Sequence, residues 1–204
     1  MFVQQCAESL ARMEGVGEIC IVDCDSTYQP LLDWYSRQSD FRVLREANLK
    51  NHAPWRTKED LSKGEPFYFV SDGDLDFGDC PSDMLLVLRD AMEKYPEIIK
   101  AGPSLKIDDL PNTKMNRDVR SHEGKYWTKE WDAMWYEAHI DTTAALYHRG
   151  HGWRGYGPAL RCKPPYEARH LPWYITELPD DMRHYVSRLD PNGLTWSPRF
   201  GVQS

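Results

Sequence analysis

Short hydrophobic runs that end in aspartates constrain this chain more than any other feature. The runs Glu18 to Asp23 (EICIVD) and Pro66 to Val70 (PFYFV) have the length and residue types of buried strands. The second run leads into Asp72, and a third extended stretch, Ile98 to Ile107, leads into Asp108. The sequence therefore predicts several strands with acids at their carboxyl ends.

Helical patterns alternate with these strands. Apolar residues recur at helical spacing over Val3 to Met13 and from Met84 to Tyr95, and a helix is also expected over Gln29 to Arg37. Further strands are expected over Phe41 to Arg45 and Ile140 to Tyr147. Alternation of this kind predicts an α/β sandwich.

In an α/β sandwich the ligand crevice lies at the carboxyl ends of the strands. We therefore expect Asp23, Asp72 and Asp108 to converge there. A chain of 204 residues is long enough for one domain with a single core.

Charge and cysteine usage narrow the function classes. The formal net charge of −7 gives no electrostatic footprint for nucleic acid, and no apolar run approaches the roughly 20 residues that a bilayer span needs. The five cysteines are scattered without a C-x-x-C pair, and the N-terminus lacks the pattern of a signal peptide. We expect reduced thiols, no membrane span and a cytoplasmic location.

The segment FVSDGDLDFGDC carries the strongest chemical indication. Asp72, Asp74 and Asp76 alternate directly after a predicted strand. Solvated turn acids are the simpler interpretation. However, clustered carboxylates repel one another unless a cation neutralises them, and oxygen ligands suit Mn²⁺ or Mg²⁺. Because the chain has neither a P-loop nor a G-x-G-x-x-G motif, we expect a diphosphate to be held through such a metal.

An Asp-x-Asp motif after a hydrophobic strand is the hallmark of nucleotide-sugar glycosyltransferases of the GT-A type. The segments ICIVDCDSTYQPLLDWY, FYFVSDGDLDFGDCPSDM, IIKAGPSLKIDDLP, HIDTTAALY and PPYEARHLPWY together resemble a small GT-A subfamily of bacteria and large DNA viruses. The resemblance implies a single GT-A domain over residues 1–204, either whole or the N-terminal part of a longer protein. Its fold would be an α/β/α sandwich around a central mixed, mostly parallel sheet.

The resemblance also implies an activity. The enzyme would transfer a hexose or deoxyhexose from a UDP-sugar to a glycan or glycoprotein acceptor in glycan synthesis, with Mn²⁺ or Mg²⁺ as cofactor. It would work in the cytoplasm, which is the host cytoplasm if the protein is viral.

Site residues follow from the same resemblance. Asp74 and Asp72 match the metal-binding pair, and His170, in His-Leu-Pro-Trp, matches a late histidine that completes the metal site. Without that context a lone histidine is more often structural. The nucleotide-sugar contacts that the resemblance implies are Asp23, Asp25, Ser26, His52, Asp72, Gly73, Asp108 and Asp109.

Transfer of a glycosyl group needs a carboxylate near the attacking oxygen or the anomeric centre. Asp141 and Glu167 are the candidates, and the sequence does not rank them; turn and cap roles are the alternative for such acids. Trp153, Tyr156 and Trp173 lie among glycines and prolines, where a flat ring would stack on the acceptor sugar.

Trp127, Trp131 and Trp135 are spaced as on one helical face, which favours core packing over sugar binding.

Two other functions stay open. The run CIVDCDST fits a haloacid-dehalogenase-type phosphatase with Asp23 as nucleophile and Asp25 as acid. Lys100 or Lys106, with the Asp108 and Asp109 pair, would supply the rest of that site, although Lys106 lies too close to the aspartate pair. The eight tryptophans would also suit a non-catalytic carbohydrate-binding module.

Overall fold

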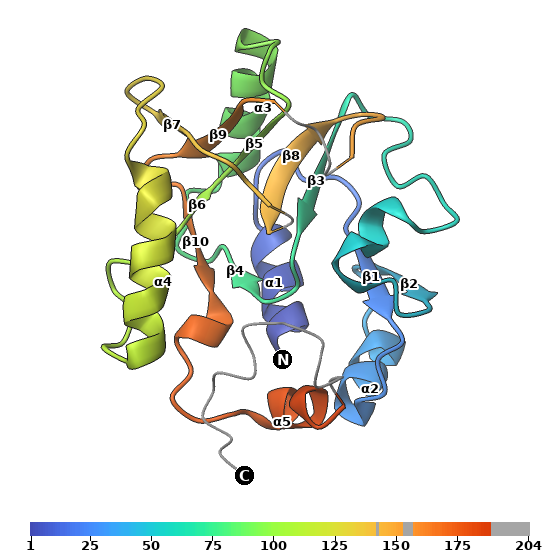
Figure 1. Ribbon diagram of the computed structural model, residues 1–204. Helices are drawn as coiled ribbons and strands as arrows, with labels where there is room; N and C mark the ends of the chain where they lie inside the picture. Colours follow the sequence, from blue (N-terminus) through green and yellow to red (C-terminus); the bar gives the residue numbers. More distant parts are fainter. Residues whose placement is uncertain (142, 153–156, 189–204) are drawn as a thin grey trace.

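The largest sheet of the protein has five strands. The computed structural model describes residues 1–141, 143–152 and 157–188. The strand order of this sheet is β3-β8-β5-β9-β7 (Figure 1). In chain order its strands are β3 (Phe67–Ser71), β5 (Lys100–Gly102), β7 (Trp135–Glu137), β8 (Ala144–His148) and β9 (Ala159–Cys162).

The five-stranded sheet is mixed. Strand β8 runs antiparallel to both β3 and β5, β9 runs parallel to β5, and β7 runs antiparallel to β9. The expected α/β class is confirmed, but the expectation of a mostly parallel sheet is wrong. Parallel neighbours need a long crossover, usually a helix. The segment from β7 to β8 supplies two strands without a helix between them, and both run against the other three.

One face of this sheet packs into the main core. Side chains alternate between the faces of a strand, so Phe69, Leu146 and Leu160 share one side. This core face packs against α3 (Met84–Lys94), whose buried residues recur at helical spacing. Helix α1 (Phe2–Leu10) packs against the same core through Cys6. Burying each large apolar side chain contributes about 1.5–3 kcal/mol.

The opposite face carries polar and aromatic side chains. Tyr68 of β3 lies opposite Tyr147 of β8, which in turn lies opposite Lys100 of β5. On β9, Arg161 lies opposite Gly102 and projects to the same side. We call the surface formed by Tyr68, Tyr147, Lys100 and Arg161 the polar face.

Two smaller sheets flank the large one. Strand β1 (Cys20–Cys24) pairs in parallel with β2 (Arg42–Glu46), and α2 (Gln29–Arg37) connects them, so the predicted strand, helix, strand unit is confirmed here. The other sheet places β10 between β4 and β6, antiparallel to β4 and parallel to β6. Its strands are β4 (Leu75–Asp76), β6 (Ser104–Leu105) and β10 (Glu167–His170).

The remaining helices surround these sheets. In Figure 1, α4 flanks the large sheet on one side, the β1–β2 unit lies on the other, and α5 lies beneath. None of the described helices is both long enough and apolar enough to cross a bilayer. The elements are η1 (Lys50–Trp55), α4 (Lys114–Gly124), η2 (Lys125–Trp127), η3 (Leu171–Trp173) and α5 (Asp180–Val186).

The three tryptophans do not share a helix. Trp127 ends η2, Trp131 lies in a turn and Trp135 begins β7, with the Trp131 N–H donating to the Trp135 carbonyl at 2.9 Å. The helical prediction is wrong because local hydrogen bonds end the helix: the Thr128 hydroxyl donates to the carbonyl of Lys125. Core packing is confirmed for Trp135, which is 5% exposed.

A short segment between β7 and β8 crosses the polar face over β5 (Figure 1). We call residues 138–141 the crossing segment. The Ala138 N–H donates to the Ala159 carbonyl, and the Tyr147 hydroxyl lies 3.5 Å from the Asp141 carbonyl. Beneath it, a Cβ at Gly102 would lie 2.2 Å from the Ala144 carbonyl oxygen and 3.1 Å from Ile140 Cδ1. Glycine is therefore required in β5 where the backbones approach.

We expect Gly102→Ala to destabilise the protein by about 2–3 kcal/mol, because the backbone of Ala144 cannot move away without breaking the ladder. Urea denaturation measures the change. Gly124→Ala is the matched control: Gly124 has helical φ and a Cβ there meets nothing within 4 Å, so this variant should be as stable as the parent or slightly more stable. Equal effects of the two substitutions would contradict the close approach at Gly102.

Candidate functional site

Three aspartates gather where β3 ends and β8 begins. The ladder continues one step past β3, because the Asp72 N–H donates to the Thr143 carbonyl at 2.7 Å. The crossing segment ends at the same place with Asp141, whose Oδ1 accepts from the N–H of Thr143 at 2.9 Å and from its hydroxyl. Burial, and after it the negative charges of Asp74 and Asp141, raise the pKa of Asp72 well above its usual value. The carboxyl groups of Asp74 and Asp141 are thus held close to that of Asp72.

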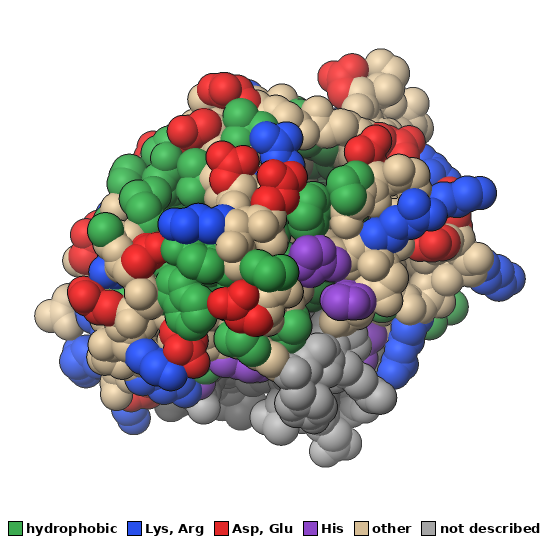
Figure 2. All heavy atoms as spheres, turned by 90° about the horizontal axis from the view of Figure 1, so that it is seen from above, with side chains coloured by type: hydrophobic (Ala, Val, Ile, Leu, Met, Phe, Trp, Pro, Cys, Tyr) green, Lys and Arg blue, Asp and Glu red, His purple; other side chains and the backbone are tan. Residues whose placement is uncertain are grey.

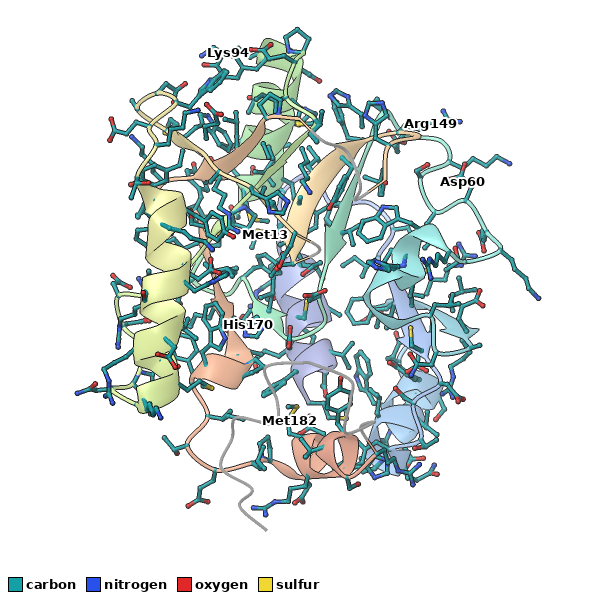
Figure 3. All side chains as sticks on the ribbon, viewed as in Figure 1. Met13, Asp60, Lys94, Arg149, His170 and Met182 are labelled. Carbon is teal, nitrogen blue, oxygen red and sulfur yellow. The ribbon has the colours of Figure 1, made fainter. Side chains whose placement is uncertain are left out.

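His170 joins this group from the far end of the chain. Strand β10 places His170 opposite Leu75, and the Leu171 N–H donates to the Asp74 carbonyl at 2.9 Å. His170 Nε2 lies 3.6 Å from Asp74 Oδ2. Figure 3 shows His170 on β10 beside β4 and α1. The expected meeting of the Asp-x-Asp motif with the late histidine therefore occurs in the structure.

Asp74 and His170 each present a buried atom with no partner. Asp74 Oδ1 and His170 Nδ1 are both shielded from water, and neither forms a hydrogen bond with any described residue. Buried polar atoms are normally satisfied, so such a pair calls for an explanation. A carboxylate oxygen and an imidazole nitrogen are both metal-ligand types, so Asp74, His170 and Asp72 have the donor atoms that divalent cations take. In the described ranges, no three His, Cys, Asp or Glu side chains are gathered closely enough to enclose one.

The neighbours of the motif have structural roles. The Cys6 thiol donates to the Asp72 carbonyl at 3.4 Å, and burial raises its pKa to about 12, so it stays neutral. Gly73 packs against Val3 of α1. The Asp76 carboxylate accepts from Gln5 Nε2 at 3.0 Å and from the Gly78 N–H at 2.9 Å. Asp76 is therefore engaged in its own turn.

Asp108, Asp109 and Glu167 form a second group of acids. Lys106 Nζ lies 2.9 Å from Asp108 and 3.5 Å from Glu167, and Arg169 lies 2.6 Å from Asp109. Because side chains alternate along β10, Glu167 projects to the opposite side from His170. The structure therefore groups Asp141, and not Glu167, with the Asp-x-Asp motif.

Glu167 is nevertheless an unusual residue. Its side chain is 8% exposed, and its Oε1 is buried without a hydrogen bond to any described residue. Burial raises the pKa of Glu167, and the ammonium of Lys106 opposes that rise.

Asp23 belongs to a third group, within the β1–β2 unit. It is 4% exposed, and its oxygens accept from the Ser26 N–H at 2.9 Å and the Tyr35 hydroxyl at 3.0 Å and pair with Arg45 at 3.2 Å. Asp23, Asp72 and Asp108 were expected to converge, but each of them has different neighbours. These contacts also leave Asp23 poorly placed as the nucleophile of a phosphatase. Next to it, Asp25 is exposed, with a left-handed φ of 65°.

The predicted aromatic and base-side contacts have different outcomes. Trp173 is 5% exposed, and its ring lies 4.5 Å from that of His170, so it supports His170 from the core and cannot stack on an acceptor sugar as expected. His52 lies half-buried in η1. Trp153 and Tyr156 lie outside the described residues.

Sequence reasoning missed Lys100 and Tyr147 as neighbours of the site. Tyr147 is 1% exposed and its hydroxyl lies next to Asp141. The available signal was a lysine inside the apolar run IIKAG, since a charged residue in a buried strand is rarely there for packing alone.

On the face shown in Figure 2, acidic and basic side chains are interspersed.

Two comparisons with known proteins find no match. A scan against models of protein families finds none that matches this chain, and a search of curated proteins finds no match either. The function has to be inferred from the residues and their geometry.

We expect Asp72→Asn to stabilise the metal-free protein at pH 7. A carboxyl whose pKa is raised by folding binds its proton more tightly in the folded state, so stability is lost as pH rises from about the ordinary value of 3.8 through the raised pKa. An amide carries no such penalty. Thermal denaturation in EDTA should show a midpoint about 2–4 °C higher than the parent at pH 7, with the difference shrinking at pH 4.

Asp76→Asn is the matched control, because Asp76 accepts two hydrogen bonds in the same segment. It should bring no gain in stability at either pH. A midpoint of Asp72→Asn below that of the parent at pH 7 would show that the Asp72 carboxylate is compensated in the folded protein.

Proposed function

We propose that this chain is a metal-dependent glycosyltransferase of the GT-A type that moves a hexose or deoxyhexose from a UDP-sugar to a sugar acceptor. The main support is the meeting of Asp74 and His170, residues from opposite halves of the chain that each keep one buried atom unpartnered. Asp72 and Asp141 lie beside them. A cation and a sugar diphosphate would complete this arrangement.

Asp72, Asp74 and His170 would hold Mn²⁺ or Mg²⁺. When bound, the metal supplies positive charge next to the leaving diphosphate, a contribution that is generally worth several kcal/mol. Asp74 and His170 each have one buried atom that forms no hydrogen bond with a described residue. Asp72 is held by the main chain at the end of β3, so it enters the site already positioned.

Asp141 is the favoured general base. In the transfer step the acceptor hydroxyl oxygen bonds to the anomeric carbon, the bond from that carbon to the diphosphate oxygen breaks, and the hydroxyl proton moves to a carboxylate. Asp141 uses Oδ1 for Thr143, and Oδ2 is the atom that would take this proton. Glu167 is the less favoured candidate because it is engaged with Lys106 on the other side of β10.

The nucleoside would bind between the β1–β2 unit and the polar face. Element η1, which carries His52, reaches the polar face through Trp55, whose Nε1 donates to the Tyr68 hydroxyl at 2.9 Å. Asp25 and the backbone of Ser26 are the groups of the β1–β2 unit that would contact it. Asp108 and Asp109, already paired with Lys106 and Arg169, are weaker candidates for the sugar.

Two observations weigh against the other functions. The Asp23 carboxylate is consumed by internal contacts, which disfavours the phosphatase. Trp135 and Trp173 are both 5% exposed, so part of the tryptophan content that suggested a carbohydrate-binding module serves the core. The cysteines of the described chain are free thiols, compatible with the cytoplasmic location that we expect.

Binding of UDP tests the proposal. Calorimetric titration of the parent protein should show UDP binding with Mn²⁺ and none after EDTA treatment. Asp74→Asn should weaken that binding about tenfold or more, because it removes a metal ligand. Asp76→Asn, in the same segment, should bind UDP within threefold of the parent.

Two results would contradict the proposal. UDP binding by Asp74→Asn that equals the parent, or binding that persists in EDTA, would remove the metal bridge. Hydrolysis of p-nitrophenyl phosphate by the parent, with loss of that activity in Asp23→Asn, would favour the phosphatase instead.

A further inference from the structure

A buried lysine occupies the centre of the polar face. Lys100 is 2% exposed and lies between Tyr147 of β8 and Ala159 of β9. Its Nζ is 5.7 Å from the centre of the Tyr147 ring. A buried ammonium costs free energy unless negative charge compensates it. Yet no carboxylate of the described residues lies within 4.0 Å of this nitrogen, since Lys100 forms no ion pair there.

The crossing segment spans the strand that carries Lys100. On the β9 side, Arg161 Nε donates to the His139 carbonyl at 3.1 Å. On the β8 side, the Tyr147 hydroxyl reaches the Asp141 carbonyl. Strand β5 lies between β8 and β9, so the segment passes over β5 before it reaches Asp141.

The charges around Lys100 select one partner. Burial lowers the pKa of Lys100, the carboxylate of Asp141 opposes that effect, and the positive charge of Arg161 adds to it. Arg161 itself is paired with Glu123 of α4 at 2.9 Å, so Glu123 is already engaged. Burial, and after it the positive charges of Lys100 and Arg161, lower the pKa of the neighbouring His139. Asp141 is thus the carboxylate whose negative charge acts on Lys100.

The exposed carboxylate of Asp141 in turn lies beside another carboxylate. It is held close enough to Asp72 for the two carboxylates to repel each other. Thr143 supplies hydrogen bonds to only one of its oxygens. A positive charge on the polar face would offset this repulsion and favour a position of the Asp141 side chain at the end of β3.

We propose that Lys100 is a positioning residue, whose ammonium beneath the crossing segment holds the Asp141 carboxylate beside Asp72. The proposal rests on the proposed function in one respect, namely that Asp141 is the base. Lys100 acts through Asp141 and does not touch the diphosphate. Its loss should therefore change turnover and leave nucleotide binding intact.

A double-mutant cycle tests the contact independently of activity. The variants are Lys100→Met, Asp141→Asn and their combination, compared by urea denaturation. Lys100→Met should be more favourable for stability in the Asp141→Asn background than in the parent, with a coupling of about threefold or more in the unfolding equilibrium constant. Lys106→Met, which removes the partner of Asp108 and Glu167, should be additive with Asp141→Asn. Additive effects of Lys100→Met would overturn the proposal.

Measurements of turnover and of UDP binding test the positioning role of Lys100. Release of UDP from UDP-glucose with Mn²⁺ should fall about tenfold or more in Lys100→Met, while the Kd for UDP stays within threefold, and Lys100→Arg should recover most of the turnover. An equal loss of UDP binding and turnover would make Lys100 a diphosphate ligand and overturn the proposal. If the parent protein binds no UDP, the proposed function fails, whereas the double-mutant cycle still decides whether Lys100 holds Asp141.

Discussion

The antiparallel pairing of β3 with β8 is the interaction on which the candidate site depends. Its ladder runs past the end of β3, where the Asp72 N–H donates to the Thr143 carbonyl. Main-chain hydrogen bonds therefore bring the segment that carries Asp72 next to the segment that carries Asp141. The sheet can hold like charges together in this way because their repulsion is small against the sum of its backbone bonds and core packing. The main-chain hydrogen bonds of the largest sheet thus oppose the repulsion between these carboxylates.

Local structure was predictable because its causes are local. The strand expected over Glu18 to Asp23 is observed as β1, and the one over Pro66 to Val70 as β3, each within about two residues. The helix over Gln29 to Arg37 is observed with the same bounds. The sequence also placed the Asp-x-Asp motif directly after a strand, and a motif resemblance pointed to His170. These features depend on residue types within one turn or one strand.

The features that were missed depend on the pairing of distant segments. The sheet was expected to be mostly parallel, but β7 and β8 run against their neighbours, and no local pattern encodes that choice. Glu167 and His170 lie three residues apart, yet the alternation of β10 sends them to different clusters. The position of Lys100 beneath the crossing segment depends on the fold and not on the residues next to it in sequence. The direction of each strand, the face on which a side chain lies and its burial are set by the packing of distant segments.

The central place of β10 has a consequence for the order of assembly. His170 belongs to β10, the last strand among the described residues, which lies between two strands that are synthesised much earlier, β4 and β6. Contacts between segments so distant in sequence form slowly because a long loop must close first. A nascent chain therefore carries the complete Asp-x-Asp motif through the synthesis of the next 96 residues without its histidine partner. The acids at the end of β3 can meet His170 only after residue 170 has been made.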